Sequence, residues 1–260
     1  MNTSLWVAKT GLEAQNVQMQ TISNNLANVN TIGFKQDRVS FESLFYTIRK
    51  EAGAETNELN RHPTGVQLGS GVKVAGTSKV FTQGAMIQTN QELDIAVEGD
   101  GFIEIEVGDD TYFTRNGQLH VNSEGQIVNS SGYPLAANIF VPEDAVGLNI
   151  SEDGVVSANI PGEAEPDELG QITIARFMNP QGLSAIGGNL YRETAASGEP
   201  NIVDPGTEGA GFIKQGMLEG SNVDVVDGMV QIIATSRGYE TGVKAISAID
   251  GMLQFITSRT

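Results

Sequence analysis

Hydrophobic residues recur every seven positions near the amino-terminal end, and this repeat constrains the fold more than any other feature of the sequence. The series consists of Leu5, Leu12, Met19 and Leu26, with Ile22 and Val29 at intermediate positions. Heptad spacing places one apolar stripe along a helix and is typical of helices that pair as coiled coils. Asparagine and glycine at residues 28–33 are helix-stop signals. The sequence therefore predicts one long helix within a first domain of residues 1–33.

A second helical pattern occupies the carboxyl-terminal end, where residues 225–260 contain no proline. Apolar residues follow spacings of three and four in this segment: Val225, Met229, Ile232, Tyr239, Val243, Ile246 and Leu253. Asp224 and Asp227 lie at the predicted start, where the helix dipole favours negative charge. We expect this helix, in a domain of residues 219–260, to pair with the first helix as a coiled coil.

Glycine is frequent in the second helical segment, at Gly228, Gly238, Gly242 and Gly251. Each glycine inside a helix costs about 1 kcal/mol relative to alanine. Two explanations remain open at this point. The glycines either permit another helix to approach closely or simply lower the stability of this one.

Short strands separated by turns are predicted between the two helices. Apolar and polar residues alternate at 102–107, and a turn signal follows. The Asn-Gly pair at 116–117 is typical of a two-residue hairpin turn, so we expect residues 111–115 to pair with residues 119–121. Strands about ten residues apart are typical of a sandwich or barrel. The chain is therefore predicted to be α+β, with a central all-β domain of residues 76–218.

Residues 34–75 fit neither the helical nor the strand pattern and are assigned to a linker or arm. Their central part, residues 51–70, is polar, lacks helical periodicity and contains Pro63 and Gly65. Composition alone favours a flexible loop over an extended arm in this part of the chain.

The polar face of the first helix carries amides and hydroxyls instead of charges. Between residues 1 and 34 the only charged side chains are those of Lys9 and Glu13. A helix that faces bulk water normally carries lysine and glutamate, whereas uncharged amides suit a face that is partly buried against other protein. We therefore expect both apolar stripes to be assembly interfaces between copies of the chain. The alternative is an ordinary intramolecular coiled-coil stalk.

The net charge of −17 makes nucleic acid and anionic membranes poor partners. The chain has no cysteine, and no apolar run reaches the length that a membrane span requires. Its first residues lack the basic region and apolar run of a secretory signal peptide. By these rules alone, the chain is expected to be soluble and cytoplasmic, without membrane insertion.

No catalytic, cofactor or metal site is predicted. His62 and His120 have no nearby cysteine or suitably spaced second histidine, so a metal site is not expected. The turn at residues 99–101 lacks the third glycine and the helix of a dinucleotide-binding loop. The chain contains 32 acidic residues, so counting alone does not exclude a pair of catalytic carboxylates.

Residues 22–35 resemble the amino-terminal signature of the flagellar rod and hook axial proteins. The matching positions are Ser23, Asn24, Asn25, Asn28, Gly33, Phe34 and Lys35. Three further segments, at 94–102, 112–117 and 221–247, resemble later motifs of that family in the same order. The resemblance covers nearly the whole chain.

Within that family, residues 46–72 resemble a stretch that distinguishes the distal-rod members. The resemblance implies an extended arm that reaches neighbouring subunits and stiffens the tube, with Pro63, Gly65, Leu68 and Gly69 in the matching part. It reverses the interpretation of this segment as a flexible loop.

The resemblance further implies a structural subunit of the distal rod, without enzymatic activity or cofactor, that assembles into an open helical filament and transmits motor torque. Its partners would be further copies of itself, proximal-rod and hook subunits, the outer ring proteins and the export apparatus. Its location would be the basal body in the periplasm, reached through type III export without a cleaved signal peptide. This location replaces the cytoplasmic expectation.

Two alternatives remain. The first is another axial subunit, from the proximal rod or the hook, which residues 46–72 would distinguish. The second is a secreted β-domain protein that binds or cleaves the cell wall and carries a helical stalk. The amide-rich face of the first helix argues against the second alternative.

Overall fold

The computed structural model describes residues 3–51, 55–57, 60–61, 64–108, 110–161 and 166–257. Two long helices and a large β-rich part confirm the predicted α+β class. The chain forms two compact units. Unit 1 contains residues 1–26, 37–78 and 224–260, and unit 2 contains residues 27–36 and 79–223. These units divide the chain differently from the four predicted domains.

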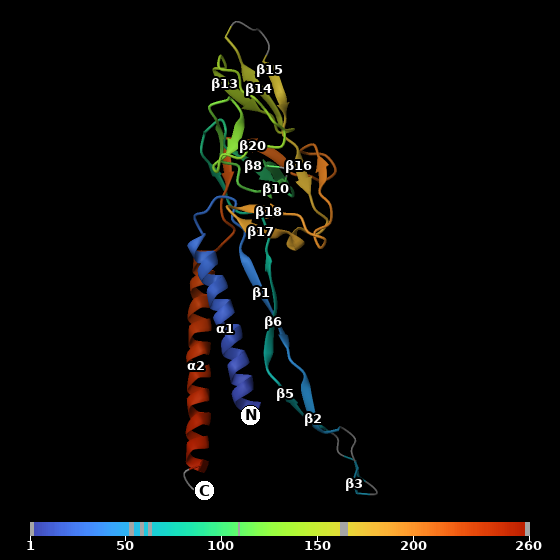
Figure 1. Cartoon of the computed structure of the whole chain (residues 1–260), viewed down its shortest axis with the longest axis vertical. Helices are drawn as coiled ribbons and strands as arrows, with labels where there is room; N and C mark the ends of the chain where they lie inside the picture. The colour runs from blue at the N-terminus through green and yellow to red at the C-terminus, as the bar shows by residue number, and fades with distance from the viewer. Residues whose placement is uncertain are drawn as a thin grey trace. The chain divides into compact units, whose positions relative to one another are not determined.

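The two helices of unit 1 are α1 (Thr3–Ala27) and α2 (Val225–Thr257), which lie side by side (Figure 1). Helix α2 begins where the sequence supplies a cap. The Asp224 carboxylate accepts hydrogen bonds from the backbone N–H groups of Val226 and Asp227, at 2.8 and 3.1 Å. These bonds satisfy two of the four unpaired N–H groups with which every helix begins.

The other described residues of unit 1 form a ribbon of paired strands (Figure 1). Its strands are β1 (Asp37–Ser43), β2 (Tyr46–Lys50), β3 (Glu55–Asn57), β4 (Asn60–Arg61), β5 (Val66–Gly69) and β6 (Val72–Lys79). Strand β1 pairs with β6, β2 with β5, and β3 with β4. The interpretation as a flexible loop is therefore wrong for the described part of residues 51–70, because its backbone groups are paired across the ribbon. Pro63 and His62 lie outside the described residues.

Unit 2 is built from short antiparallel strands and one turn of 3-10 helix, η1 (Pro180–Gly182). The strands are β7 (Met86–Gln88), β8 (Ile95–Glu98), β9 (Phe102–Val107), β10 (Asp110–Thr114), β11 (Leu119–Val121), β12 (Ile127–Asn129), β13 (Gly147–Ile150), β14 (Val155–Asn159), β15 (Asp167–Gln171), β16 (Ile174–Arg176), β17 (Ser184–Gly187), β18 (Leu190–Arg192), β19 (Asn201–Val203), β20 (Phe212–Gln215) and β21 (Met217–Glu219). The largest sheet has the order β17-β18-β10-β9-β16-β19. A three-stranded sheet, β13-β14-β15, and several strand pairs complete the unit.

The alternation of side chains along β9 gives the six-stranded sheet two different faces. Ile103 and Ile105 point into the main aliphatic core, together with residues of β8, β11, β12 and β16. Phe102 points to the opposite face and packs in a small aromatic cluster with Phe113 and Tyr191. The main core thus lies on one face of the sheet, and the other face is covered only in part.

One predicted hairpin is wrong. The segment that contains the Asn-Gly pair at 116–117 does not connect paired strands, because β10 pairs with β9 and β18 whereas β11 pairs with β12. Gly117 instead lies against the backbone of Ile95, whose N–H donates to the Gly117 carbonyl at 3.0 Å. This tertiary contact, and not a local turn, determines the path of the chain after β10.

Candidate functional site

The most unusual feature of unit 2 is a buried cluster of three charged side chains, Lys35, Arg115 and Glu219. The Lys35 ammonium lies 2.7 Å from Glu219 Oε1, and the Arg115 guanidinium lies 3.3 Å from Glu219 Oε2. Lys35 and Glu219 are fully buried, and Arg115 is nearly so. Glu219 Oε1 also accepts a hydrogen bond from the backbone N–H of Gly84 at 2.9 Å. One carboxylate is therefore shared by two cations and one backbone donor.

Backbone carbonyls satisfy further donors of the two cations. Lys35 donates to the Thr82 carbonyl at 2.8 Å, and Arg115 donates to the carbonyls of Val97 and Gly99. Burial lowers the pKa of Lys35, and the charge of Glu219 opposes that shift. Burial lowers the pKa of Arg115 in the same way, again opposed by Glu219. The cluster joins chain segments that are far apart in the sequence, all of them within unit 2.

The Gly-Phe-Lys part of the sequence motif lies in this cluster. Gly33 has a φ of +69°, and an added Cβ would lie 2.7 Å from the backbone of Arg115. Its N–H donates to the Glu219 carbonyl at 2.8 Å. Phe34 is buried, with the Lys79 ammonium 5.0 Å from its ring centroid. Glycine, a large apolar side chain and a long cation are thus each required by contacts within unit 2.

The asparagines of the motif act locally. In unit 1 the Asn25 side chain both donates to the Asp37 carbonyl and accepts from the Asp37 N–H, each at 2.8 Å. Asn24 donates to the Asp37 carboxylate at 3.4 Å. In unit 2 the Asn28 side chain accepts from the Thr31 hydroxyl at 3.1 Å, within the turn that follows α1. Ser23 is exposed.

The apolar positions predicted as helix seams fall into two groups. The partly or fully buried ones are Leu5, Leu12, Met19, Ile22, Leu26 and Val29 near the amino terminus, and Ile232 and Ile246 on α2. Met229, Tyr239 and Val243 are 40–54% exposed. The side chain of Leu253 lies outside the described part of α2. Their role between copies of the chain stays a prediction.

The two central glycines of α2 face α1. An added Cβ at Gly238 would lie 2.8 Å from the Gln15 side chain, and one at Gly242 would lie 2.7 Å from Leu12. Gly228 and Gly251 have open space around them. The question left open by the sequence therefore has a mixed answer, because Gly238 and Gly242 permit close approach whereas the other two do not face α1.

Unit 1 presents large apolar side chains to solvent on both its second helix and its ribbon. On α2 these are Val226, Met229, Val230 and Ile233, and on the ribbon they are Phe41, Phe45, Tyr46, Ile48, Val66 and Leu68. Val226 is 71% exposed and Phe45 is 89% exposed. Of the other predicted arm residues, Gly69 lies against the Tyr46 ring and Gly65 directly precedes β5. Groups of exposed apolar side chains are typical of sites of protein interaction.

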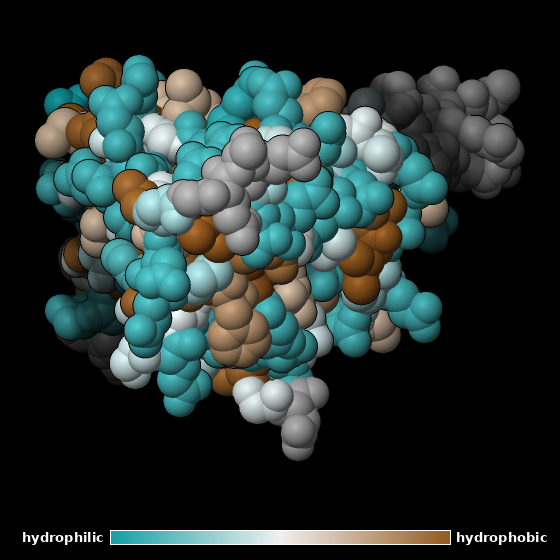
Figure 2. All heavy atoms as spheres, turned by 90° about the horizontal axis from the view of Figure 1, so that it is seen from above, coloured by the Kyte–Doolittle hydropathy of each residue, from teal (hydrophilic) through white to brown (hydrophobic). Residues whose placement is uncertain are grey.

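A different surface character prevails on the face of the molecule seen in Figure 2. Hydrophilic side chains predominate there, and hydrophobic ones form small groups between them. Within the described residues, no group of three or more His, Asp or Glu side chains is arranged to hold a metal ion. None of the described helices is long and apolar enough to cross a membrane.

Sequence reasoning missed the central member of the buried cluster. Lys35 was identified from the family motif, and Arg115 lies in a second motif, but Glu219 carried no local signal. It stands 184 residues after Lys35, in a strand that contains no other charge. Only the folded structure brings the three side chains together.

Three families of known proteins match the chain. Residues 5–35 match the flagella basal body rod protein family, residues 96–158 match the flagellar hook protein FlgE/F/G D1 domain, and residues 214–259 match the C-terminal family of the flagellar basal body rod FlgEFG proteins.

Full-length relatives match as well. The chain is 47% identical to the flagellar basal-body rod protein FlgG of Borreliella burgdorferi over 256 residues, which is 97% of each chain. It is 42% identical to FlgG of Buchnera aphidicola from Schizaphis graminum, over 98% of each chain. It is 36% identical to FlgG of Bacillus subtilis, over 98% of this chain and 97% of the relative.

Proposed function

The chain belongs to the FlgG family of flagellar basal-body rod proteins, and from this premise we propose how its parts serve a structural subunit of the distal rod. The family is one of structural proteins, so the function is assembly and the transmission of force. The proposal divides the chain into four working parts: the helix of residues 1–33, the arm of residues 34–75, the β-rich body of residues 76–218 and the helix of residues 219–260.

The two helices form, in this proposal, a coiled-coil pair that completes its apolar core only against neighbouring copies. The observation that carries it is the uncovered apolar face of α2, where Val226, Val230 and Ile233 are more than half exposed. Fully burying one such side chain stabilises by about 1.5–3 kcal/mol. Repeated copies would bury these faces in turn, and a contact between unlike surfaces that does not close into a ring produces an open helical filament.

Electron microscopy of the purified full-length chain tests this proposal. We expect straight tubes of uniform diameter, and we expect Val230→Ser combined with Ile233→Ser to abolish them. A matched variant, Val146→Ser with Met178→Ser, removes two exposed apolar side chains from unit 2 and should leave the tubes intact. Tubes that persist in the α2 variant, or a chain that never polymerises, would contradict the proposed core.

The ribbon serves as the arm that reaches neighbouring subunits. Its exposed apolar residues, among them Phe45, Ile48 and Leu68, support a role in contacts with other chains. A two-stranded ribbon has no second layer of its own that could cover these side chains. Arms that bridge between subunits would limit their relative motion and stiffen the rod.

We further propose the wider setting that this family implies. Matches to domains shared by hook and rod proteins support contacts with proximal-rod and hook subunits at the two ends of the distal rod. A rod location between the motor and the hook implies surrounding ring proteins in the periplasm, and delivery by the flagellar export apparatus without a cleaved signal.

A further inference from the structure

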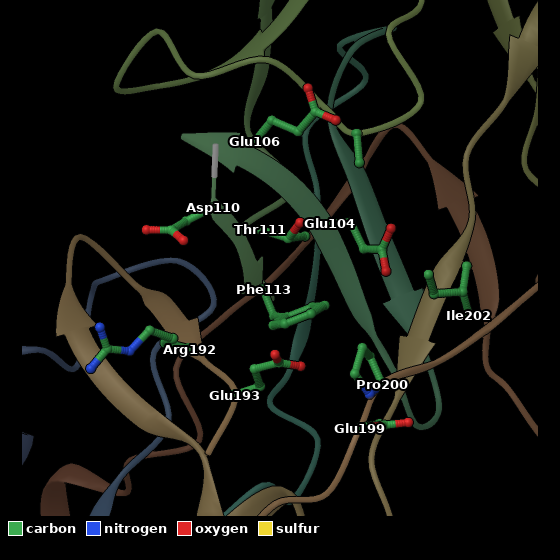
Figure 3. A pocket seen from close by; sticks show the side chains of 11 residues that line it. Glu104, Glu106, Asp110, Thr111, Phe113, Arg192, Glu193, Glu199, Pro200 and Ile202 are labelled. Atoms are coloured by element: carbon green, nitrogen blue, oxygen red, sulfur yellow. The ribbon is translucent and has the colours of Figure 1, made fainter. Parts of the chain in front are cut away.

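A pocket rich in carboxylates lies on the partly covered face of the six-stranded sheet (Figure 3). Its volume is about 790 Å³. The acidic side chains that line it are Glu104, Glu106, Asp110, Glu193 and Glu199, and Arg192 is the one basic side chain among its lining residues. All of them belong to unit 2, so the pocket does not depend on the helices or the ribbon.

Strand register creates this concentration of charge. Glu104 and Glu106 are two positions apart on β9 and therefore point to the same face. They stand opposite Phe113 and Thr111 of β10. Figure 3 shows Glu104 and Phe113 projecting from neighbouring strands. On this face, β9 therefore contributes Phe102 to the aromatic cluster at one end and two carboxylates further along the strand.

Glu104 is the side chain that distinguishes this pocket from an ordinary acidic surface. It is only 7% exposed, and its Oε1 atom has no hydrogen-bond partner. Desolvation raises its pKa, and the neighbouring charge of Glu106 raises it further. A buried carboxylate without a partner is costly, since desolvated charge normally requires a counter-charge or a hydrogen bond. A positively charged group in the pocket would supply both.

The chemistry of the pocket selects among cations. The described residues contain no cluster of three metal ligands, which argues against a single metal ion. Carboxylates spread around a large cavity instead suit the longer and more diffuse charge of arginine side chains, which donate in several directions.

We propose that this pocket is a docking site for an arginine-containing basic segment of another protein. A partner different from this chain is favoured by charge, because the chain has only 15 lysine and arginine residues against 32 acidic ones, so a second copy offers few basic segments. The proposal goes beyond rod assembly and does not depend on it, since it rests on residues of unit 2 alone.

Fluorescence anisotropy with a labelled peptide of four Arg-Gly repeats provides the test, on the full-length chain. We expect Glu104→Gln combined with Glu106→Gln to raise the Kd at least tenfold. The control is Glu124→Gln with Glu143→Gln, which removes the same charge from exposed positions outside the pocket and should change the Kd less than twofold. The same peptide with citrulline in place of arginine should not bind.

Three outcomes would overturn the proposal. Equal losses of peptide affinity in the two double variants would mean that the peptide is attracted by the acidic surface in general and not by this pocket. Competition by millimolar Mg²⁺ or Ca²⁺ beyond that of KCl at equal ionic strength would identify a metal site. Loss of self-association in the Glu104/Glu106 variant would identify a second copy as the occupant.

A second measurement does not depend on any variant being folded. In the unchanged chain, the carbon-13 signal of the Glu104 carboxyl reports its titration directly. Binding of the arginine peptide should move the titration midpoint to lower pH, because a nearby cation favours the charged form. An unmoved midpoint at saturating peptide would count against contact with Glu104.

Discussion

Glu219 holds two cations that are almost fully buried. The carboxylate offers two oxygens, and Lys35 and Arg115 take one each, while Gly84 N–H shares the first. Removing one member of a buried ion pair leaves an uncompensated charge, which is far more costly than losing a surface pair. Of the three side chains, Glu219 is therefore the one whose loss should destabilise the cluster most, because it is the counter-ion of both cations.

Glu219→Gln should strongly destabilise unit 2. Glutamine keeps the shape of the side chain but leaves two buried cations without a counter-charge, at a cost of about 3–5 kcal/mol. Urea unfolding followed by tyrosine fluorescence measures this cost. Glu143→Gln, at an exposed position, is the control and should unfold with the unchanged chain. Equal midpoints for the two variants would contradict a structural role for the cluster.

Glu104→Gln should have the opposite effect, and its size should depend on pH. The pKa of Glu104 is raised above its ordinary value of 4.5, so the folded chain keeps this proton at pH values where the unfolded chain has lost it. The free energy of unfolding therefore falls as pH rises through that window. The charge of Glu106 on the same strand adds to the raised pKa of Glu104. Glu193, Glu199 and Arg192 also line the pocket.

The glutamine variant should be more stable than the unchanged chain at pH 7, and the two should converge below about pH 4, where both states of Glu104 are protonated. Thermal unfolding across this pH range measures the difference. A variant that loses stability at pH 7 would show that the Glu104 carboxylate is satisfied by a partner in the folded chain.

At the scale of elements, heptad spacing predicted both helices but gave no signal for the glycines at their contact. The spacing rule selects large apolar residues, so it favoured Met229, Tyr239 and Val243 on α2. Close approach to α1 instead occurs at Gly238 and Gly242, which have no side chain to register in a hydrophobic pattern. A helix contact that depends on glycine therefore leaves no trace in the periodic pattern of apolar residues.

Replacing one of two glycines of α2 by leucine should distinguish the effect of packing against α1 from the effect of helix propensity. Gly251→Leu gains about 0.8 kcal/mol of propensity and meets open space. Gly242→Leu gains the same propensity but collides with Leu12, whose Cδ2 would lie 2.7 Å from the new Cβ. Circular dichroism should show more helix in the first variant and less in the second. Equal helix content would mean that the two helices do not need this approach.

The strands show where local signals succeed and fail. The turn after β9 was predicted, and it connects antiparallel neighbours in the structure. The Asn-Gly pair at 116–117 has an equally strong local signal, but the contact of Gly117 with Ile95 overrides it. Turn chemistry predicts pairing only where no distant segment competes for the same backbone groups.

For the whole molecule, the sequence predicted the α+β class and, through the resemblance, the family. Both depend on patterns that recur along the chain, namely helix periods, strand spacing and ordered motifs. The buried cluster and the acidic pocket were not predicted, because Glu219 and Glu104 acquire their environments from segments distant in sequence. Among 32 acidic residues, nothing local marks these two.

Shortening the ribbon should change the mechanics of the assembled rod without preventing assembly. If the arm stiffens the rod, then a chain lacking residues 51–65 should still form tubes, because both helices are intact, but the tubes should bend. Persistence length from electron micrographs measures this. A same-length Gly/Ser replacement of residues 51–65 separates loss of length from loss of sequence. Straight, rigid tubes from the deletion would contradict the proposed role of the arm.

The distance of Glu219 from Lys35 along the chain has a consequence for biosynthesis. A ribosome releases both cations long before the carboxylate, since Glu219 follows Lys35 by 184 residues and Arg115 by 104. Until translation reaches Glu219, burying Lys35 and Arg115 would leave them without their counter-ion. We therefore expect incomplete nascent chains not to close this part of the protein, so that its folding waits for nearly the entire polypeptide.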